Sequence, residues 1–128
     1  MSLSEGQSIE LKVTPDPYVT VRYAGASGDF NPIHTDKDYA TMVGLPSTIL
    51  HGLYSMAQVA RGVTAAAGGP ENVKSLEVQF RGMGFPEKEI VVSGTVRSVD
   101  DGIATIDTVA TQDGSQIIRN AVATVVSK

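Results

Sequence analysis

Residues 52–67 form the segment that most constrains how this chain can fold. The stretch carries one charged residue, Arg61, among small and apolar side chains. A helix that is apolar on nearly all sides is normally buried inside a protein. Gly68-Gly69-Pro70 then stops the helix. The sequence therefore predicts a buried central helix over residues 52–67, about 24 Å long.

Alternation of apolar and polar residues predicts strands on both sides of this helix. The candidate strands are residues 9–13, 74–82, 88–99, 103–112 and 116–126. Asp101-Gly102 and Asp113-Gly114 fall in the last two gaps, and these dipeptides are typical of tight hairpin turns. We therefore expect a single α+β domain over residues 1–128, with a curled antiparallel sheet wrapped around the central helix.

Two shorter helices are expected between the first strand and the central helix. Asp16 is a candidate cap for a helix with Pro17 at its first position, which runs to about Ala26. Acidic residues at the start and Gly44 at the end predict the second helix over residues 36–43. Pro32 pushes the residue before it toward an extended backbone, so a turn is expected between the two helices.

Composition narrows the choice of partners and compartment. The net charge is −4 and no Lys/Arg cluster occurs, so we expect neither a nucleic acid nor an acidic membrane surface as a partner. No apolar run approaches the ~18 residues of a membrane span. Residues 1–7 lack the basic and apolar regions of a secretory signal, and we expect a cytoplasmic protein. Two histidines without any cysteine show no recognisable ligand spacing, so no metal site is predicted.

Asp29 and His34 are the candidates for acid–base chemistry. They lie five residues apart in the run Gly28-Asp29-Phe30-Asn31-Pro32-Ile33-His34, across a bend that would turn both side chains into one pocket. A carboxylate and an imidazole in one pocket can hold and deprotonate a water molecule. Taken without the surrounding run, Asp29 is better explained as a turn residue that bonds its own backbone.

Two segments carry a resemblance to a known family. The run Tyr23-Ala24-Gly25-Ala26-Ser27 together with Gly28–Asp36 resembles the hydratase signature of the MaoC-like dehydratases. Leu50-His51-Gly52-Leu53-Tyr54-Ser55-Met56-Ala57 resembles the start of that family's central helix. The resemblance implies a hot-dog fold. It also implies (R)-specific hydration of a trans-2-enoyl thioester, or dehydration of a 3-hydroxyacyl thioester in the reverse direction.

The same resemblance implies roles for individual residues. Asp29 and His34 would hold the water between them, and which of the two is the base stays open. The backbone N–H of Gly52 would stabilise the enolate oxygen, with Asn31 and His51 as supporting residues. The substrate would be carried on coenzyme A or an acyl carrier protein, with no other cofactor.

The chain departs from the family at one place. Family members often continue from a strand ending Phe-Arg into a loop containing Pro-Gly-Asp. Here Phe80-Arg81 is followed by Gly82-Met83-Gly84, without the Gly-Asp step. The shape of this loop, and of an acyl pocket beside it, is therefore left open.

Two alternative functions compete with the hydratase. A hot-dog thioester hydrolase would usually carry a carboxylate on or near its central helix, and residues 52–67 contain neither Asp nor Glu. A subunit of a heterodimeric dehydratase is the second alternative, and this chain would be the catalytic subunit because it keeps both Asp29 and His34. We expect a homodimer or higher homo-oligomer, because a single hot dog leaves a sheet edge or face uncovered.

Overall fold

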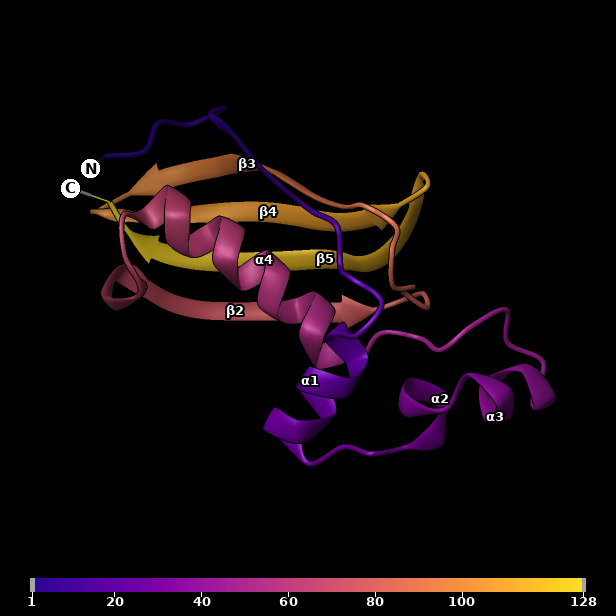
Figure 1. Ribbon diagram of the computed structural model, residues 1–128. Helices are drawn as coiled ribbons and strands as arrows, with labels where there is room; N and C mark the ends of the chain where they lie inside the picture. The colour runs from indigo at the N-terminus through magenta and orange to yellow at the C-terminus, as the bar shows by residue number, and fades with distance from the viewer. Residues whose placement is uncertain (1, 128) are drawn as a thin grey trace.

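The computed structural model describes residues 2–127. Within that range, five strands pair into one antiparallel sheet in the order β1-β3-β4-β5-β2. Figure 1 shows β3, β4, β5 and β2 side by side. The strands are β1 (Ser8–Val13), β2 (Val73–Phe80), β3 (Ile90–Asp100), β4 (Ile103–Gln112) and β5 (Ser115–Val126). All five predicted strands are confirmed, with ends that differ by up to two residues.

Two tight hairpins build the middle of the sheet. Asp101 and Gly102 join β3 to β4, and their φ angles are 51° and 77°. Asp113 and Gly114 join β4 to β5 with φ angles of 48° and 78°. Positive φ at both central residues is the type I′ pattern, whose twist matches that of the flanking strands. Both predicted hairpins are therefore confirmed, while β1 and β2 reach the two edges through long connections.

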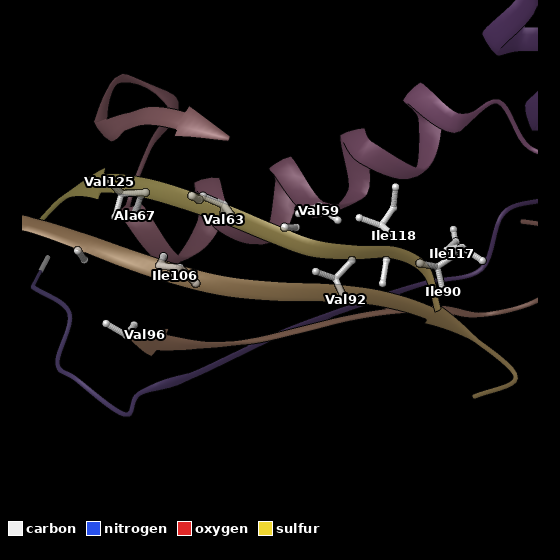
Figure 2. Close-up of a cluster of buried hydrophobic side chains, with 14 of the residues drawn as sticks. Val59, Val63, Ala67, Ile90, Val92, Val96, Ile106, Ile117, Ile118 and Val125 are labelled. Atoms are coloured by element: carbon white, nitrogen blue, oxygen red, sulfur yellow. The ribbon is translucent and has the colours of Figure 1, made fainter. Parts of the chain in front are cut away.

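Helix α4 (Gly52–Ala67) crosses one face of the sheet, with the ends that the sequence predicts (Figure 1). Figure 2 shows Val59, Val63 and Ala67 along this helix, beside aliphatic side chains of β3, β4 and β5. All three side chains are buried, and they form the core together with the sheet. The expected curled antiparallel sheet around a central helix, the hot-dog architecture, is confirmed.

Burial of α4 on nearly all sides is not what the structure shows. The side of the helix turned away from the sheet is exposed at Leu53, Ala57 and Arg61. The physical reason is that the sheet covers only one face of the helix, and α1 (Val19–Ser27) lies only near its N-terminal end (Figure 1). Arg61 therefore reaches solvent from an otherwise uncharged helix.

Residues 14–51, here called the helical arm, connect β1 to α4. The arm contains α1, α2 (Pro32–Thr35) and α3 (Lys37–Met42), and α2 and α3 lie beyond the end of the sheet (Figure 1). The helix predicted over 36–43 corresponds to α3, whose N-cap is Asp36. The Asp36 carboxylate accepts hydrogen bonds from the backbone N–H groups of Asp38 and Tyr39 at 3.0 and 3.2 Å.

The predicted start of the first helix is wrong. Helix α1 begins at Val19, two residues after Pro17, and its N-cap is Tyr18 without a side-chain hydrogen bond. Asp16 is occupied elsewhere, because its carboxylate accepts a hydrogen bond from the N–H of Tyr18 at 2.7 Å and pairs with the guanidinium of Arg22. The helix ends at Ser27, one residue after the predicted end, and its C-cap is Gly28 with a φ of 80°.

A short 3-10 helix, Pro70–Asn72, leads from α4 into β2. Leu3 lies beside the other end of the chain, and its N–H donates a hydrogen bond to the Ser127 hydroxyl at 2.8 Å. No helix within residues 2–127 has the length and apolar character needed to cross a lipid bilayer.

Candidate active site

His34 lies on α2, a one-turn helix that the sequence analysis did not predict. The Asn31 side chain caps this helix by accepting a hydrogen bond from the N–H of Ile33 at 3.1 Å. Pro32 follows at the first helical position, where its missing N–H costs nothing. Asn31 and Pro32 thus mark the start of a helix. The extended backbone expected at Asn31 is present, and it is the conformation of the N-cap residue. Asn31 therefore shapes the bend that carries His34.

Asp29 lies in the bend between α1 and α2, and the two oxygens of its carboxylate have different neighbours. One oxygen, Oδ1, accepts a hydrogen bond from the N–H of Asn31 at 3.2 Å, as in an Asx turn. The other oxygen, Oδ2, lies 3.8 Å from Nε2 of His34. Asp29 is therefore a turn residue, and the turn contact leaves Oδ2 facing the imidazole.

The His34 ring is fixed by its second nitrogen. Nδ1 lies 2.7 Å from the backbone oxygen of Ile49. A carbonyl oxygen can only accept, so Nδ1 carries the hydrogen and Nε2 is left to exchange a proton on the side of Asp29. The side chain of His34 is 10% exposed and that of Asp29 is 53% exposed. The pair therefore combines a fixed, buried imidazole with a carboxylate open to solvent.

His51, a supporting residue by the family resemblance, lies directly against the pair through a ring stack that the sequence did not predict. Its ring stacks on that of His34, with centroids 3.9 Å apart and planes inclined by 19°. Nε2 of His51 lies 2.9 Å from the backbone oxygen of Asp29, so this nitrogen donates its hydrogen. Tyr23 covers the ring at a centroid distance of 4.8 Å. His51 therefore supports the backbone of one member of the pair and the ring of the other.

Gly52 is the first residue of α4, so its N–H has no acceptor inside the helix. The helix end also carries a partial positive charge. A Cβ atom at this position would lie 3.2 Å from the Phe80 ring, which is tighter than ordinary contact. The glycine thus keeps open the narrow space between the helix start and Phe80.

Two cavities meet at this narrow space. An outer cavity of about 320 Å³ is lined by Tyr23, Ser27, Asp29, His51, Gly52, Leu53 and Phe80. An inner cavity of about 200 Å³ is lined by His34, Ile49, Leu50, Gly52, Ser55, Phe80, Gly82, Met83, Gly84, Ile117 and Ile118. Asp29 therefore borders one cavity and His34 the other, while Gly52 and Phe80 border both.

The loop after Phe80 forms one wall of the inner cavity. Gly84 accepts a hydrogen bond through its backbone oxygen from the N–H of Leu50 at 2.8 Å. The buried side chain of Gln112 holds the next residue, because its amide bonds both the N–H and the carbonyl of Phe85 at 2.8 Å. The loop that lacks the Gly-Asp step is thus tied to the segment that carries His51 into α4.

Sequence reasoning missed Phe80, which separates the two cavities. No local pattern predicts its position, because it reaches the site through packing between distant segments. Tyr23 and Ser55 lie within the segments that resemble the family, and the structure places Tyr23 over His51 and the buried Ser55 in the wall of the inner cavity. A larger hollow of about 770 Å³ lies on the far face of the sheet, and the charged pair that lines it, Arg97 and Asp107, is mutually neutralised.

Asp29, His34 and His51 offer three possible metal-ligand atoms within 4.8 Å of one another. A nitrogen lone pair lies in the plane of its imidazole ring, and the two stacked rings have nearly parallel planes. Lone pairs in two nearly parallel planes cannot both point at one ion. The arrangement therefore favours proton transfer at this site over metal coordination.

Comparison with known proteins identifies the family. Residues 4–116 match the MaoC like domain, so the chain belongs to the family of MaoC-like domains. A solved structure titled the ChsH1-ChsH2 complex from Mycobacterium tuberculosis superimposes with a TM-score of 0.85 and 28% identity, over 98% of each chain. The unliganded (R)-hydratase PhaJ1 from Pseudomonas aeruginosa has the same fold, with a TM-score of 0.88 at 22% identity over 98% of this chain and 82% of that one.

Curated relatives are similar to parts of this chain. Fatty acid synthase subunit beta from Schizosaccharomyces pombe is 45% identical over 73 residues, which is 54% of this chain. Peroxisomal enoyl-CoA hydratase 2 from Arabidopsis thaliana is 33% identical over 67 residues, or 51% of this chain. The matched part spans 4% of the yeast protein's length and 22% of the plant protein's length.

Proposed function

We propose that this protein is a hydro-lyase that adds water to a trans-2-enoyl thioester and forms an (R)-3-hydroxyacyl thioester, reversibly. The observation that carries the proposal is the 3.8 Å separation between Asp29 Oδ2 and His34 Nε2, beside the free N–H of Gly52. Membership of the MaoC-like family and similarity to the plant enoyl-CoA hydratase 2 support the same activity.

The separation within the pair suits a shared water molecule. At 3.8 Å the two atoms do not bond each other directly, but one oxygen between them can contact both. The pair removes a proton from this water as its oxygen bonds to the β-carbon of the substrate. The electrons of the carbon–carbon double bond move toward the thioester oxygen. A proton from the pair then reaches the α-carbon, so the protonation of Asp29 and His34 is unchanged overall.

The start of α4 supplies the electrostatic part of this mechanism. Negative charge develops on the thioester oxygen, and the N–H of Gly52 is a donor without an intrahelical acceptor. Losing one such donor typically costs about 3–4 kcal/mol of transition-state stabilisation. The thioester carbonyl polarises the double bond itself, so the reaction needs no cofactor beyond the coenzyme A or acyl carrier protein that bears the substrate.

The two cavities separate the parts of the substrate. The inner cavity beside His34 is lined mainly by aliphatic side chains and Met83, which suits the acyl chain. The outer cavity beside Asp29 opens toward solvent and suits the thioester and its carrier. The inner cavity has a volume of about 200 Å³, which makes a short acyl chain the better substrate for this site.

A second copy of the chain is the expected partner. Strand β2 pairs with β5 on one side only, among the described residues, so its other edge is free to pair. Phe80 ends this strand and is half exposed, as is Leu53 at the start of α4. The similarity to the ChsH1-ChsH2 complex keeps a heterodimer as the alternative assembly. A thioester hydrolase is less favoured, because α4 offers no carboxylate for it.

The test is incubation of the purified protein with a short trans-2-enoyl-CoA. Loss of the conjugated thioester absorbance without release of free thiol is the expected result. Thiol release would instead make the protein a hydrolase. Activity that appears only after a second, co-purifying chain is added would support the heterodimer.

A further inference from the structure

Arg61 is the only charged residue of α4, and the proposed reaction gives it no role. Its side chain is exposed, yet it is held in place. Nη1 donates a hydrogen bond to the side-chain oxygen of Gln58 at 2.6 Å, and Gln58 itself is only 5% exposed. No carboxylate of the described chain lies within ion-pairing distance of Arg61. Its positive charge is therefore fixed by a buried neighbour and left without a counter-ion.

Arg61 faces a groove between α1 and α4. The groove has a volume of about 390 Å³, and Arg22, Tyr54 and Arg61 line it. Tyr23 borders both this groove and the outer cavity beside Asp29, so the two hollows adjoin. The groove thus begins where the thioester is expected to leave the catalytic pair.

The charges around the groove leave an excess of positive charge. Arg22 is neutralised by Asp16, which also fixes the direction of its guanidinium. Burial raises the pKa of the Tyr54 hydroxyl, so this group keeps its proton and can donate a hydrogen bond. Fixed guanidinium and hydroxyl donors in a groove are suited to phosphate oxygens, because arginine presents several N–H groups in one plane.

We infer that the α1–α4 groove binds a phosphate group of the substrate's carrier arm, with Arg61 as the principal ligand and Arg22 and Tyr54 beside it. This inference rests on the proposed function, since it assigns the carrier end of the same substrate. Coenzyme A and the phosphopantetheine arm of an acyl carrier protein both supply such a phosphate, and an N-acetylcysteamine thioester supplies none.

The test compares these three carriers of one short enoyl group. Arg61→Met keeps the length of the side chain and removes its charge, Arg61→Lys keeps the charge, and Arg97→Met on the far face of the sheet is the control. The KM for the phosphate-bearing substrate should rise about tenfold in Arg61→Met, because one charged hydrogen bond is lost. The KM for the N-acetylcysteamine thioester, and every kcat, should stay as in the wild type.

Salt gives a second readout. Added salt should raise the KM of the wild type for the phosphate-bearing substrate and have less effect in Arg61→Met, because the screened attraction is already gone. An effect with the carrier-protein substrate alone, or with coenzyme A alone, supports the inference and identifies the source of the phosphate. An equal effect on the N-acetylcysteamine thioester, or no effect on any substrate, overturns it.

Binding of free coenzyme A by calorimetry separates this inference from the proposed function. If the protein hydrates no enoyl thioester but binds coenzyme A, and Arg61→Met weakens this binding, the proposed reaction is contradicted and the groove assignment is supported. If the protein hydrates all three substrates and Arg61→Met changes none of the KM values, the proposed reaction is supported and the groove assignment is contradicted.

Discussion

The helical arm and the sheet with α4 are held together by different kinds of interaction. The hydrophobic core consists mainly of residues from α4 and the strands, and Val19 and Leu50 are the members that the arm contributes among the described residues. The arm also leaves Phe30 and Met42 largely exposed. Apolar burial therefore stabilises the sheet and α4 far more than it stabilises the arm.

The arm is ordered instead by hydrogen bonds between side chains and nearby backbone. Asp29, Asn31 and Asp36 each accept one from an N–H two residues ahead. His34 and His51 bond the backbone oxygens of Ile49 and Asp29. The fold and the site therefore depend on separate contacts, and substitutions should separate stability from activity.

The largest separation is expected at the catalytic pair. Asp29→Asn or His34→Ala should lower kcat by a factor of roughly 10²–10⁴, because a positioned acid–base group is removed. Thermal unfolding of Asp29→Asn should change little, since the Asp29 side chain is half exposed and the contacts of the core remain. His34→Ala should also lower the unfolding temperature, because it removes the bond to Ile49 and the stack on His51. Asp113→Asn, on a hairpin turn far along the chain, is the matched carboxylate control. Full activity in Asp29→Asn would contradict the catalytic role of the Asp29–His34 pair.

The opposite separation is expected in the sheet. Ile106 on β4 is fully buried against the core. Ile106→Ala should lower the free energy of unfolding by about 2–5 kcal/mol, because it leaves a cavity under α4. Below the unfolding transition, kcat should match the wild type. Denaturant unfolding and turnover measured on the same sample check both statements, and a large loss of kcat in the folded variant would contradict them.

A smaller, mixed effect is expected at Asn31. Asn31→Ala removes the cap of α2 and should cost about 1 kcal/mol of stability. The same change should lower kcat, because α2 positions His34 opposite Asp29. Asn31→Ser restores a capping oxygen without adding charge and should recover most of the loss. Equal damage from Ala and Ser would mean that Asn31 acts by something other than capping.

The smallest effect is expected from a polar contact on the far face of the sheet. Hydrogen bonds from Arg97 lower the pKa of the Asp107 carboxyl below its ordinary value of 3.8. The pair therefore stabilises the fold above that value, and this contribution is lost as the pH falls through the lowered pKa. Because both side chains are about half exposed, Asp107→Asn should reduce the unfolding temperature only slightly at neutral pH. The difference from the wild type should vanish in acid, and a difference that grows in acid would contradict this sign.

Local patterns predicted the regular elements well. Both ends of α4 were predicted correctly, because the mainly small and apolar side chains of residues 52–67 continue until Gly68. Both hairpins were predicted from the two Asp-Gly pairs, because a tight turn needs positive φ angles and these residue types adopt them. The strand order β1-β3-β4-β5-β2 could not be predicted from the sequence, since the pairing of each edge strand depends on contacts between distant segments.

The site was predicted in part. The approach of Asp29 to His34 follows from the bend around Pro32 and from the family resemblance, and the structure brings the two side chains together. The stack of His51 on His34 and the position of Phe80 between the cavities have no local signal. Both arise where the arm, the start of α4 and the end of β2 meet, and only the folded chain shows that junction. The catalytic roles of these residues stay predictions until they are measured.

The most direct test of the proposed reaction follows the oxygen of water. The wild type would be incubated with a short trans-2-enoyl-CoA in water labelled with heavy oxygen, and the products analysed by mass spectrometry. An intact thioester with the heavy oxygen on carbon 3 is the predicted product, and it would be absent with Asp29→Asn. Heavy oxygen in a free carboxylic acid, together with released coenzyme A, would contradict the hydratase and establish hydrolysis.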